Sequence, residues 1–420
     1  MDRNPSSRSP VHVVYGGAHL FKSDTPQKLG KIALRSIKTY APDVDEFAAA
    51  MGLDESKKLL QSIYKKTSDK LQREPVEDFR IDFEDGYGFR PDAEEDADAI
   101  KASSELAAAF LKKTVTPVCG FRIKSFAPET HARAVNTLNL FLENFLKKTK
   151  SRLPENFVVT LPKISDPREI GELARRLARV ESDNRLAPGS IGIEIMIETP
   201  RAVVDEKGRV ALAGLVEAAN GRCTSAHFGA YDYTSALGIS AAHQHLRHDA
   251  CNFARQMMLV TLAPLGIRLV DSVTTRMPIA LHKEPKLTAD QRNDNRRSVH
   301  AGWREHFDNV TTSMTNGFYQ SWDLHPNQLV ARYAAVYAFF LRSKDVDAAR
   351  LRGFIEKATK ANLAGSTFDD AASANGLMNF FRSGLDCGAF GESEIKKATS
   401  LSARETRNSS FAEIAGGSEK

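Results

Sequence analysis

The sequence predicts an α/β protein built as a (β/α)8 TIM barrel, with a helical insertion and a helical C-terminal extension. Short apolar runs rich in β-branched residues recur eight times along the 420-residue chain. Between them lie longer segments with apolar residues at i, i+3, i+4 and i+7, the spacing of amphipathic helices. Eight strands joined by helical crossovers fit a closed parallel barrel, and a doubly wound open sheet is the structural alternative.

The eight expected strands follow one another in chain order. They are VHVVY (11–15), FRIDF (79–83), CGFRIKSF (119–126), FVVTLPKI (157–164), IGIEIMIE (191–198), SAHFGAYD (225–232), IRLVDSV (267–273) and GFYQSWDLHP (317–326). We place the barrel domain at 10–330, with a helical insertion at 40–78. A helical extension is expected at 331–400, and the polar tail at 401–420 is expected to be disordered.

The composition is that of an ordinary globular protein. The net charge of +5 arises from 58 basic and 53 acidic residues that are spread along the chain. No basic stripe interleaved with aromatic residues is present, so nucleic acid is not an expected partner. The N-terminal MDRNPSSRSP lacks the apolar run of a signal peptide, and nothing suggests a membrane protein, so we expect a cytoplasmic location.

The run IGIEIMIE (191–198) places two glutamates on an otherwise apolar strand. Successive side chains of a strand face opposite ways, so Glu194 and Glu198 share the face opposite the isoleucines. A buried carboxylate needs a cation, a metal or water, because an unpaired buried charge costs several kcal/mol. Glu194 lies one layer deeper, and we expect it to be a buried ion-pair partner.

The same alternation brings charges from other strands to the barrel axis. The side chains expected to face inward are Arg80, Asp82, Glu84, Arg122 and Lys124. Barrels of this type carry their reaction site at the C-terminal strand ends. The charged residues at or near those ends are Glu84, Asp85, Arg122, Lys163, Glu198, Asp232 and Asp271.

Glu198 and Asp232 follow adjacent strands and form a candidate metal site. Two carboxylates can hold Mg²⁺ when water and substrate oxygens complete the coordination shell. Mn²⁺ fits about as well. The alternative is that both carboxylates pair with Arg122 and Lys163 and that no metal binds.

Seven motifs in one order resemble the HpcH/HpaI aldolase and citrate lyase β-subunit family of phosphoenolpyruvate/pyruvate-type barrels. They are DFEDGYG (82–88), FRIKS (121–125), LPK (161–163), IEIMIETP (193–200), FGAYDYT (228–234), ARQMMLVTLAPLGIRLVDSV (254–273) and WDLHPNQ (322–328). They occur in family order across about three quarters of the chain. The insertion at 40–78, the helical C-terminal end and YGGAHLF (15–21) look like a divergent branch sometimes labelled phosphoenolpyruvate kinase.

The resemblance implies roles for individual residues. The family's metal-binding glutamate and aspartate correspond to Glu198 and Asp232, and its arginine that grips the substrate carboxylate and enolate oxygen corresponds to Arg122. The aldolase branch has a histidine where this chain has Asp85, whereas the citrate-lyase-like branch has an acidic residue there.

Together these observations predict a Mg²⁺-dependent carbon–carbon lyase that acts on a small 2-oxo or hydroxy acid, or its coenzyme A thioester. The expected catalytic residues are Arg122, Asp85, Glu84 and Lys163, and the expected substrate contacts are Arg122, Gly86 and Asp271. The alternatives are a phosphoryl-transfer enzyme for phosphoenolpyruvate or pyruvate and a metabolite-binding barrel without chemistry. Relatives are commonly oligomeric, so a homo-oligomer is expected. The arginine-rich stretch 282–309 is a candidate lid or, alternatively, a solvated face.

Overall fold

A computed structural model describes residues 8–363 and 371–415, and its centre is a closed barrel of eight parallel strands. Hydrogen bonding follows chain order and closes between the first and the last strand. The strands are β1 His12–Gly17, β2 Asp78–Asp82, β3 Val118–Arg122, β4 Phe157–Leu161, β5 Gly192–Ile197, β6 Cys223–Phe228, β7 Arg268–Val273 and β8 Gln320–Asp323. The predicted TIM barrel is confirmed, and closure rules out the doubly wound sheet.

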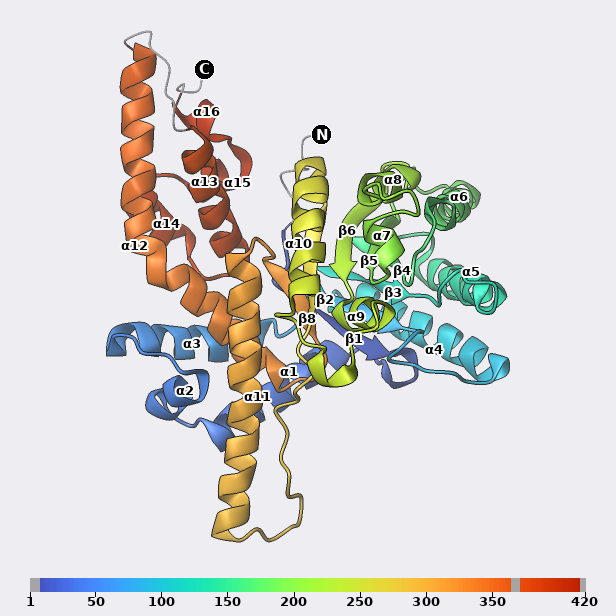
Figure 1. Ribbon diagram of the computed structural model, residues 1–420, viewed down its shortest axis with the longest axis horizontal. Helices are drawn as coiled ribbons and strands as arrows, with labels where there is room; N and C mark the ends of the chain where they lie inside the picture. The colour runs from blue at the N-terminus through green and yellow to red at the C-terminus, as the bar shows by residue number, and fades with distance from the viewer. Residues whose placement is uncertain (1–7, 364–370, 416–420) are drawn as a thin grey trace.

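Helices surround the barrel (Figure 1). Those before β8 are α1 Thr25–Tyr40, α2 Val44–Met51, α3 Lys57–Arg73, α4 Asp92–Leu111, α5 His131–Thr149, α6 Pro167–Asp183, α7 Pro200–Val203, α8 Leu212–Ala218, α9 Ala230–Ala236, α10 Asp249–Leu262 and α11 Ala289–Thr315. Short 3-10 turns lie at Ala18–Leu20, Ala241–His243 and Ala263–Leu265. In the described residues, no helix combines the length and apolar character that crossing a bilayer requires.

The C-terminal helices are α12 Gln328–Leu363, α13 Ala371–Asp386, α14 Glu392–Thr399, α15 Ala403–Asn408 and α16 Phe411–Ala415. The first turns of α12 are buried against α3 and α11, so this helix covers the barrel before it extends away from it. The expected boundary at 331 therefore falls inside one continuous helix.

The expectation of a disordered tail is wrong for residues 401–415, which form α15 and α16. Leu401 and Phe411 are buried, and Arg382 of α13 donates hydrogen bonds to three carbonyl groups of this segment. A largely polar segment is thus ordered by two apolar anchors and one arginine. The expectation for residues 416–420 lies outside the described residues.

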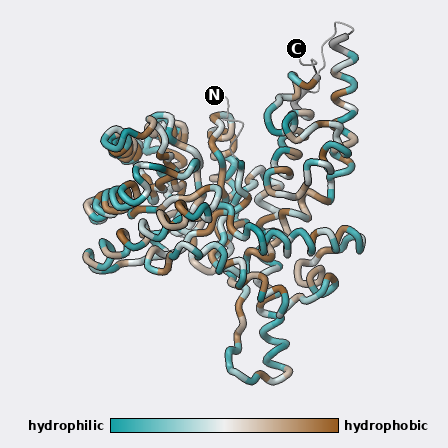
Figure 2. The backbone as a smooth tube through the Cα atoms, turned by 180° about the vertical axis from the view of Figure 1, so that it is seen from behind, coloured by the Kyte–Doolittle hydropathy of each residue, from teal (hydrophilic) through white to brown (hydrophobic). Residues whose placement is uncertain are grey.

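Residues 282–309 contribute most of α11, which extends past the barrel as an arm (Figure 1). Arg296 pairs with Glu46 of α2, and the His300 ring contacts the Tyr40 carbonyl. The projecting end is mostly hydrophilic (Figure 2). These contacts attach the arm to the helical insertion.

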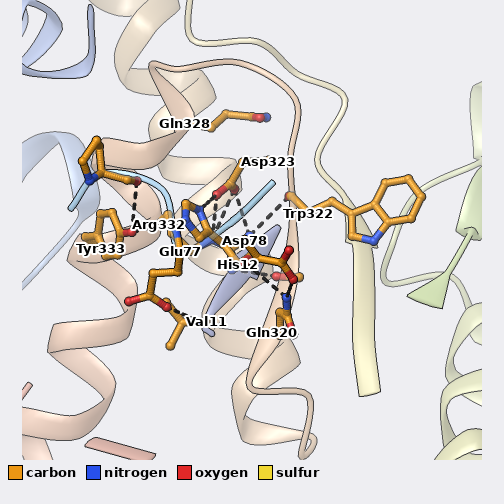
Figure 3. Close-up of polar contacts among 12 residues, drawn as sticks. Val11, His12, Glu77, Asp78, Gln320, Trp322, Asp323, Gln328, Arg332 and Tyr333 are labelled. Atoms are coloured by element: carbon orange, nitrogen blue, oxygen red, sulfur yellow. Dashed lines mark hydrogen bonds and ion pairs between the residues drawn. The ribbon is translucent and has the colours of Figure 1, made fainter. Parts of the chain in front are cut away.

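A buried polar cluster fixes α11 and α12 to the outer face of β1 and β8 (Figure 3). The Asp323 carboxylate lies 2.6 Å from His12 Nδ1, 2.7 Å from His306 Nε2 and 2.9 Å from Arg332 Nη2. The Glu77 N–H donates to His12 Nε2, so the ring proton of a neutral His12 is on Nδ1, facing Asp323. The Asp323 carboxylate therefore links β1 and β8, the first and last strands, to α11 and α12.

Glu194 forms a buried ion pair with Arg80 in the barrel interior. Arg80 donates to both Glu194 carboxylate oxygens at 2.6 Å, and the Thr160 and Ser225 hydroxyls donate to them at 2.9 and 2.6 Å. All four side chains are buried. The predicted ion-pair role of Glu194 is confirmed.

We expect Glu194→Ala to destabilise the fold by about 3–5 kcal/mol, because Arg80 would keep a buried charge that Asp78 alone must balance. Asp69→Ala is the control, since Asp69 belongs to an exposed ion pair with Lys65 and should cost less than about 1 kcal/mol. Urea unfolding of both variants measures the difference. Equal losses would contradict the structural role of Glu194.

Candidate active site

Arg122 and Asp82 form the central ion pair at the mouth of the barrel. They are the last residues of β3 and β2 and lie in register. Arg122 Nε and Nη2 donate to the two Asp82 oxygens at 2.7 and 2.6 Å, and both side chains are buried. Asp82 also accepts hydrogen bonds from the N–H groups of Glu84 and Gly86. One carboxylate thus orients the guanidinium and shapes the loop after β2.

Two aromatic side chains lie against this guanidinium. Arg122 Cζ is 4.8 Å from the Tyr15 ring centroid, and Trp322 stacks on Tyr15 with a centroid distance of 4.5 Å. The Tyr15 hydroxyl lies 3.1 Å from His227 Nδ1. The indole of Trp322 points away from the Asp323 cluster (Figure 3). We call Tyr15, His227 and Trp322 the aromatic floor.

The aromatic floor was missed in the sequence, although a signal for it was present. His12, Val14 and Asp323 face the helices, so strand alternation sends Tyr15 and Trp322 inward. That Tyr15 reaches across the barrel to His227 of β6 follows only from closure of the sheet.

Glu84, Asp85 and Lys163 meet above Arg122, as predicted. Lys163 Nζ contacts Glu84 and lies 2.9 Å from Asp85 Oδ1, and Arg122 Nη1 lies 3.2 Å from Glu84 Oε2. Burial and the Asp85 charge raise the pKa of Glu84 despite both cations. Burial opposes the charge of Lys163, but the two carboxylates outweigh it and raise its pKa, so the amine stays protonated.

Glu198 lies beside this group with its charge incompletely balanced. Its side chain is only 2 % exposed, and it accepts a hydrogen bond from the Lys163 N–H. Burial, helped by the charges of Asp232 and Glu84, raises its pKa to about 8 in spite of Arg122 and Lys163. Asp232, in the first turn of α9, is exposed. Glu198 and Asp232, the predicted metal ligands, therefore lie close enough for the charge of Asp232 to affect the pKa of Glu198.

The residues at Glu198 fit a hard divalent cation. Among the described residues, no group of three or more His, Cys, Asp or Glu side chains is arranged to hold a metal. Two carboxylates suffice when substrate and water supply the other ligands, as Mg²⁺ commonly requires. At position 229 a Cβ would lie 2.4 Å from Glu198 Cβ and 2.7 Å from its Oε2, so only glycine allows the backbone to approach Glu198 this closely. Burial and, to a smaller extent, Asp232 and Glu84 disfavour the charged form of Glu198, which a bound cation would favour.

Three predicted positions differ in the structure. Asp271 faces outward, where it accepts hydrogen bonds from Arg255 and Ser313, so its assignment as a substrate contact is wrong. The reason is alternation, because Val270 faces the interior. The Gly86 N–H is used by Asp82 and does not face an open site. Lys124 lies beyond the end of β3 and pairs with Glu95 of α4, away from the barrel axis.

Comparisons with known proteins give the following matches. Residues 3–414 match the family described as "Domain of unknown function (DUF6986)". No curated protein matches the chain by sequence. A solved structure of Haloferax volcanii malate synthase, as a lead(II) complex, has 15 % identity and a TM-score of 0.47, over 96 % of this chain and 100 % of that chain.

Two further structures are similar at the same level. RipC from Yersinia pestis has 13 % identity and a TM-score of 0.43, over 80 % of this chain and 96 % of that one. The HpcH/HpaI aldolase from Desulfitobacterium hafniense DCB-2 has 11 % identity and a TM-score of 0.38, over 76 % and 86 %. Similarities this weak identify no reaction.

The raised pKa of Glu198 predicts a pH-dependent stability in metal-free buffer. Between the ordinary glutamate pKa and about 8, the folded state holds a proton that the unfolded chain has lost. Stability attributable to Glu198 should therefore fall as pH rises from about 4.5 to 8, by roughly a few kcal/mol at most. Glu198→Gln should flatten this part of the curve. Urea unfolding at several pH values measures it, and unchanged slopes in the variant would contradict the assignment.

Proposed function

The chain belongs to the DUF6986 family, whose description names no reaction, and we propose that it is a Mg²⁺-dependent carbon–carbon lyase. The substrate class is a small 2-oxo or hydroxy acid, or its coenzyme A thioester. One observation carries the proposal. Carboxylates that lack enough positive charge nearby lie beside a buried arginine at the mouth of the barrel. Glu198 has a pKa raised to about 8, and the neighbouring Arg122 is held by Asp82.

Lyase chemistry on such acids needs a place for the electron pair that a breaking carbon–carbon bond leaves behind. Glu198 and Asp232 would hold the cation, which when bound supplies positive charge that stabilises the enolate. Arg122 Nη1 has no hydrogen-bond acceptor in the protein, although Glu84 lies within ion-pair distance. Its N–H groups are therefore available to a substrate carboxylate or enolate oxygen, in a dry site where such a contact is strong.

Glu84 is the group best suited to exchange a proton with the substrate. Its pKa is raised, which brings it toward the range useful to a general base near neutral pH. In the cleavage direction, Glu84 would take the proton of the substrate hydroxyl as the carbon–carbon bond breaks. The electron pair of that bond becomes the enolate, which then takes up a proton to give the 2-oxo acid. Lys163 holds Glu84 in place.

The assay is incubation with Mg²⁺ and a panel of hydroxy acids, 2-oxo acids and acyl-CoA thioesters. Release of pyruvate, oxaloacetate or glyoxylate supports the proposal. ATP-dependent loss of pyruvate would replace it with phosphoryl transfer. Thermal stabilisation by a panel compound without turnover would replace it with metabolite binding.

Arg122→Lys should lower kcat with the substrate identified in that assay by about 10²–10³-fold, because lysine keeps the charge but loses the planar fork. The control is Arg179→Lys, at an exposed position on α6, which should leave kcat unchanged. Equal activity of both variants would remove Arg122 from the mechanism.

Binding of Mg²⁺ at pH 7 should release close to one proton per site, since Glu198 is mostly protonated without a cation. Titration calorimetry in two buffers with different ionisation enthalpies measures the release. Glu198→Gln should bind Mg²⁺ more weakly and release no proton. Proton-free binding by the unmodified protein would contradict the proposed ligand.

A further inference from the structure

Two N–H donors at the barrel mouth are buried without a hydrogen-bond acceptor in the protein. They are Arg122 Nη1 and the indole Nε1 of Trp322. Both side chains are more than nine-tenths buried, with exposed fractions of 2 % and 8 %. A buried donor without a partner costs about 1–3 kcal/mol, and native proteins retain few of them. Arg122 Nη1 has ion-pair contacts with Glu84 at 3.2 Å and Asp85 at 3.8 Å, whereas the Trp322 indole N–H has no acceptor in the described residues.

The chain holds a matched comparison in its other tryptophan. Trp303 is also buried, and its Nε1 donates to the Asn327 carbonyl at 2.7 Å. The fold thus satisfies one indole N–H and leaves the other without a partner. The unsatisfied indole is the one that lies at the candidate active site.

The two side chains that carry these donors are neighbours. Trp322 stacks on Tyr15 at 4.5 Å, and Arg122 Cζ is 4.8 Å from the same ring. Arg122 Cζ is only 5.9 Å from the Trp322 ring. On opposite faces of Tyr15 they would be much farther apart, so Arg122 and Trp322 are direct neighbours beside Tyr15.

We propose that Trp322 is a ligand-binding residue whose indole N–H and Arg122 Nη1 together bind the carboxylate of a small 2-oxo acid. This inference rests on the proposed function and deepens it. Two adjacent N–H donors match the two oxygens of a carboxylate. A phosphate would bring more negative charge next to the Glu84 carboxylate, which already lies 3.2 Å from Arg122 Nη1.

The charge of the donor pair also suits a monoanion. Asp82 balances most of the Arg122 charge through two hydrogen bonds. The donors of Arg122 and Trp322 therefore present a partial positive charge and the dipole of a neutral N–H. The indole N–H can only donate, so it discriminates in favour of an acceptor oxygen at that position. A carboxylate supplies such an acceptor on both of its oxygens, and its charge strengthens both hydrogen bonds.

The test is pyruvate binding in the presence of Mg²⁺, measured by titration calorimetry on the full chain. Trp322→Phe keeps an aromatic ring to stack on Tyr15 and removes the donor together with the five-membered ring that carries it. It should raise the Kd for pyruvate by roughly 10- to 100-fold, the effect of one lost hydrogen bond to a charged oxygen. Trp303→Phe is the control, which should lower Tm and leave the Kd unchanged.

A second measurement does not depend on the folding of the Trp322 variant. Wild-type protein labelled with ¹⁵N should give two indole N–H signals, which the Trp303→Phe spectrum assigns. Pyruvate with Mg²⁺ should move the Trp322 indole proton downfield, as expected when it gains an acceptor, and leave that of Trp303 in place.

The possible outcomes separate the two proposals. If wild-type protein does not bind pyruvate but binds inorganic phosphate, both the substrate class and the Trp322 inference are overturned. Pyruvate binding that is equal in the wild type and Trp322→Phe, with an unmoved Trp322 indole signal, overturns the inference alone and leaves the lyase proposal standing.

Discussion

The Arg122–Asp82 ion pair is the contact on which the rest of the barrel mouth depends. A closed barrel excludes water from its interior, so each charge there needs a partner of opposite sign. Asp82 fixes two N–H groups of Arg122, and its remaining oxygen positions accept the amides of the following loop. Glu84 lies at 3.2 Å from the third guanidinium nitrogen. Without this arginine, the carboxylates at the mouth would have only Lys163 to balance them.

Glu194 and Glu198 lie on the same face of one strand, yet their surroundings make them different. Glu194 is held by an arginine and two hydroxyl groups, and its pKa is lowered well below the usual value, burial notwithstanding. Glu198, two pleat repeats closer to the mouth and just past the end of β5, has carboxylates as neighbours and a pKa raised mainly by burial. Tyr15 lies between the two layers, with Arg122 against its ring and His227 at its hydroxyl. The hydrogen-bonding positions of Glu194 are filled by protein groups, so its role is structural. Glu198 has fewer such partners and can still bind a cation.

The helical extension is connected to the site through β8. Asp323 faces outward and binds Arg332 of α12, while the adjacent Trp322 faces inward onto Tyr15 (Figure 3). Because neighbouring residues of a strand move together, the helix that anchors Asp323 also sets the position of the indole. His306 of α11 binds the same carboxylate, so the arm and the extension share one anchor.

The sequence by itself determined the eight strands and the inward direction of Arg80, Arg122, Glu194 and Glu198, because the alternation of side chains along a strand is a local property. It favoured a barrel over a doubly wound sheet, and closure of the sheet decided between them. It also brought Glu84, Asp85 and Lys163 to one end, since parallel strands end together. Only the tertiary structure decided which groups meet across the barrel: closure brings Tyr15 to His227 and Trp322 to Arg122. Ends of elements were less well determined, because Lys124 turns outward where β3 stops and residues 401–415, which carry a Ser402–Glu405 capping box, form helices packed on α12 and α13. Such contacts join residues far apart in the chain, and no local pattern encodes them.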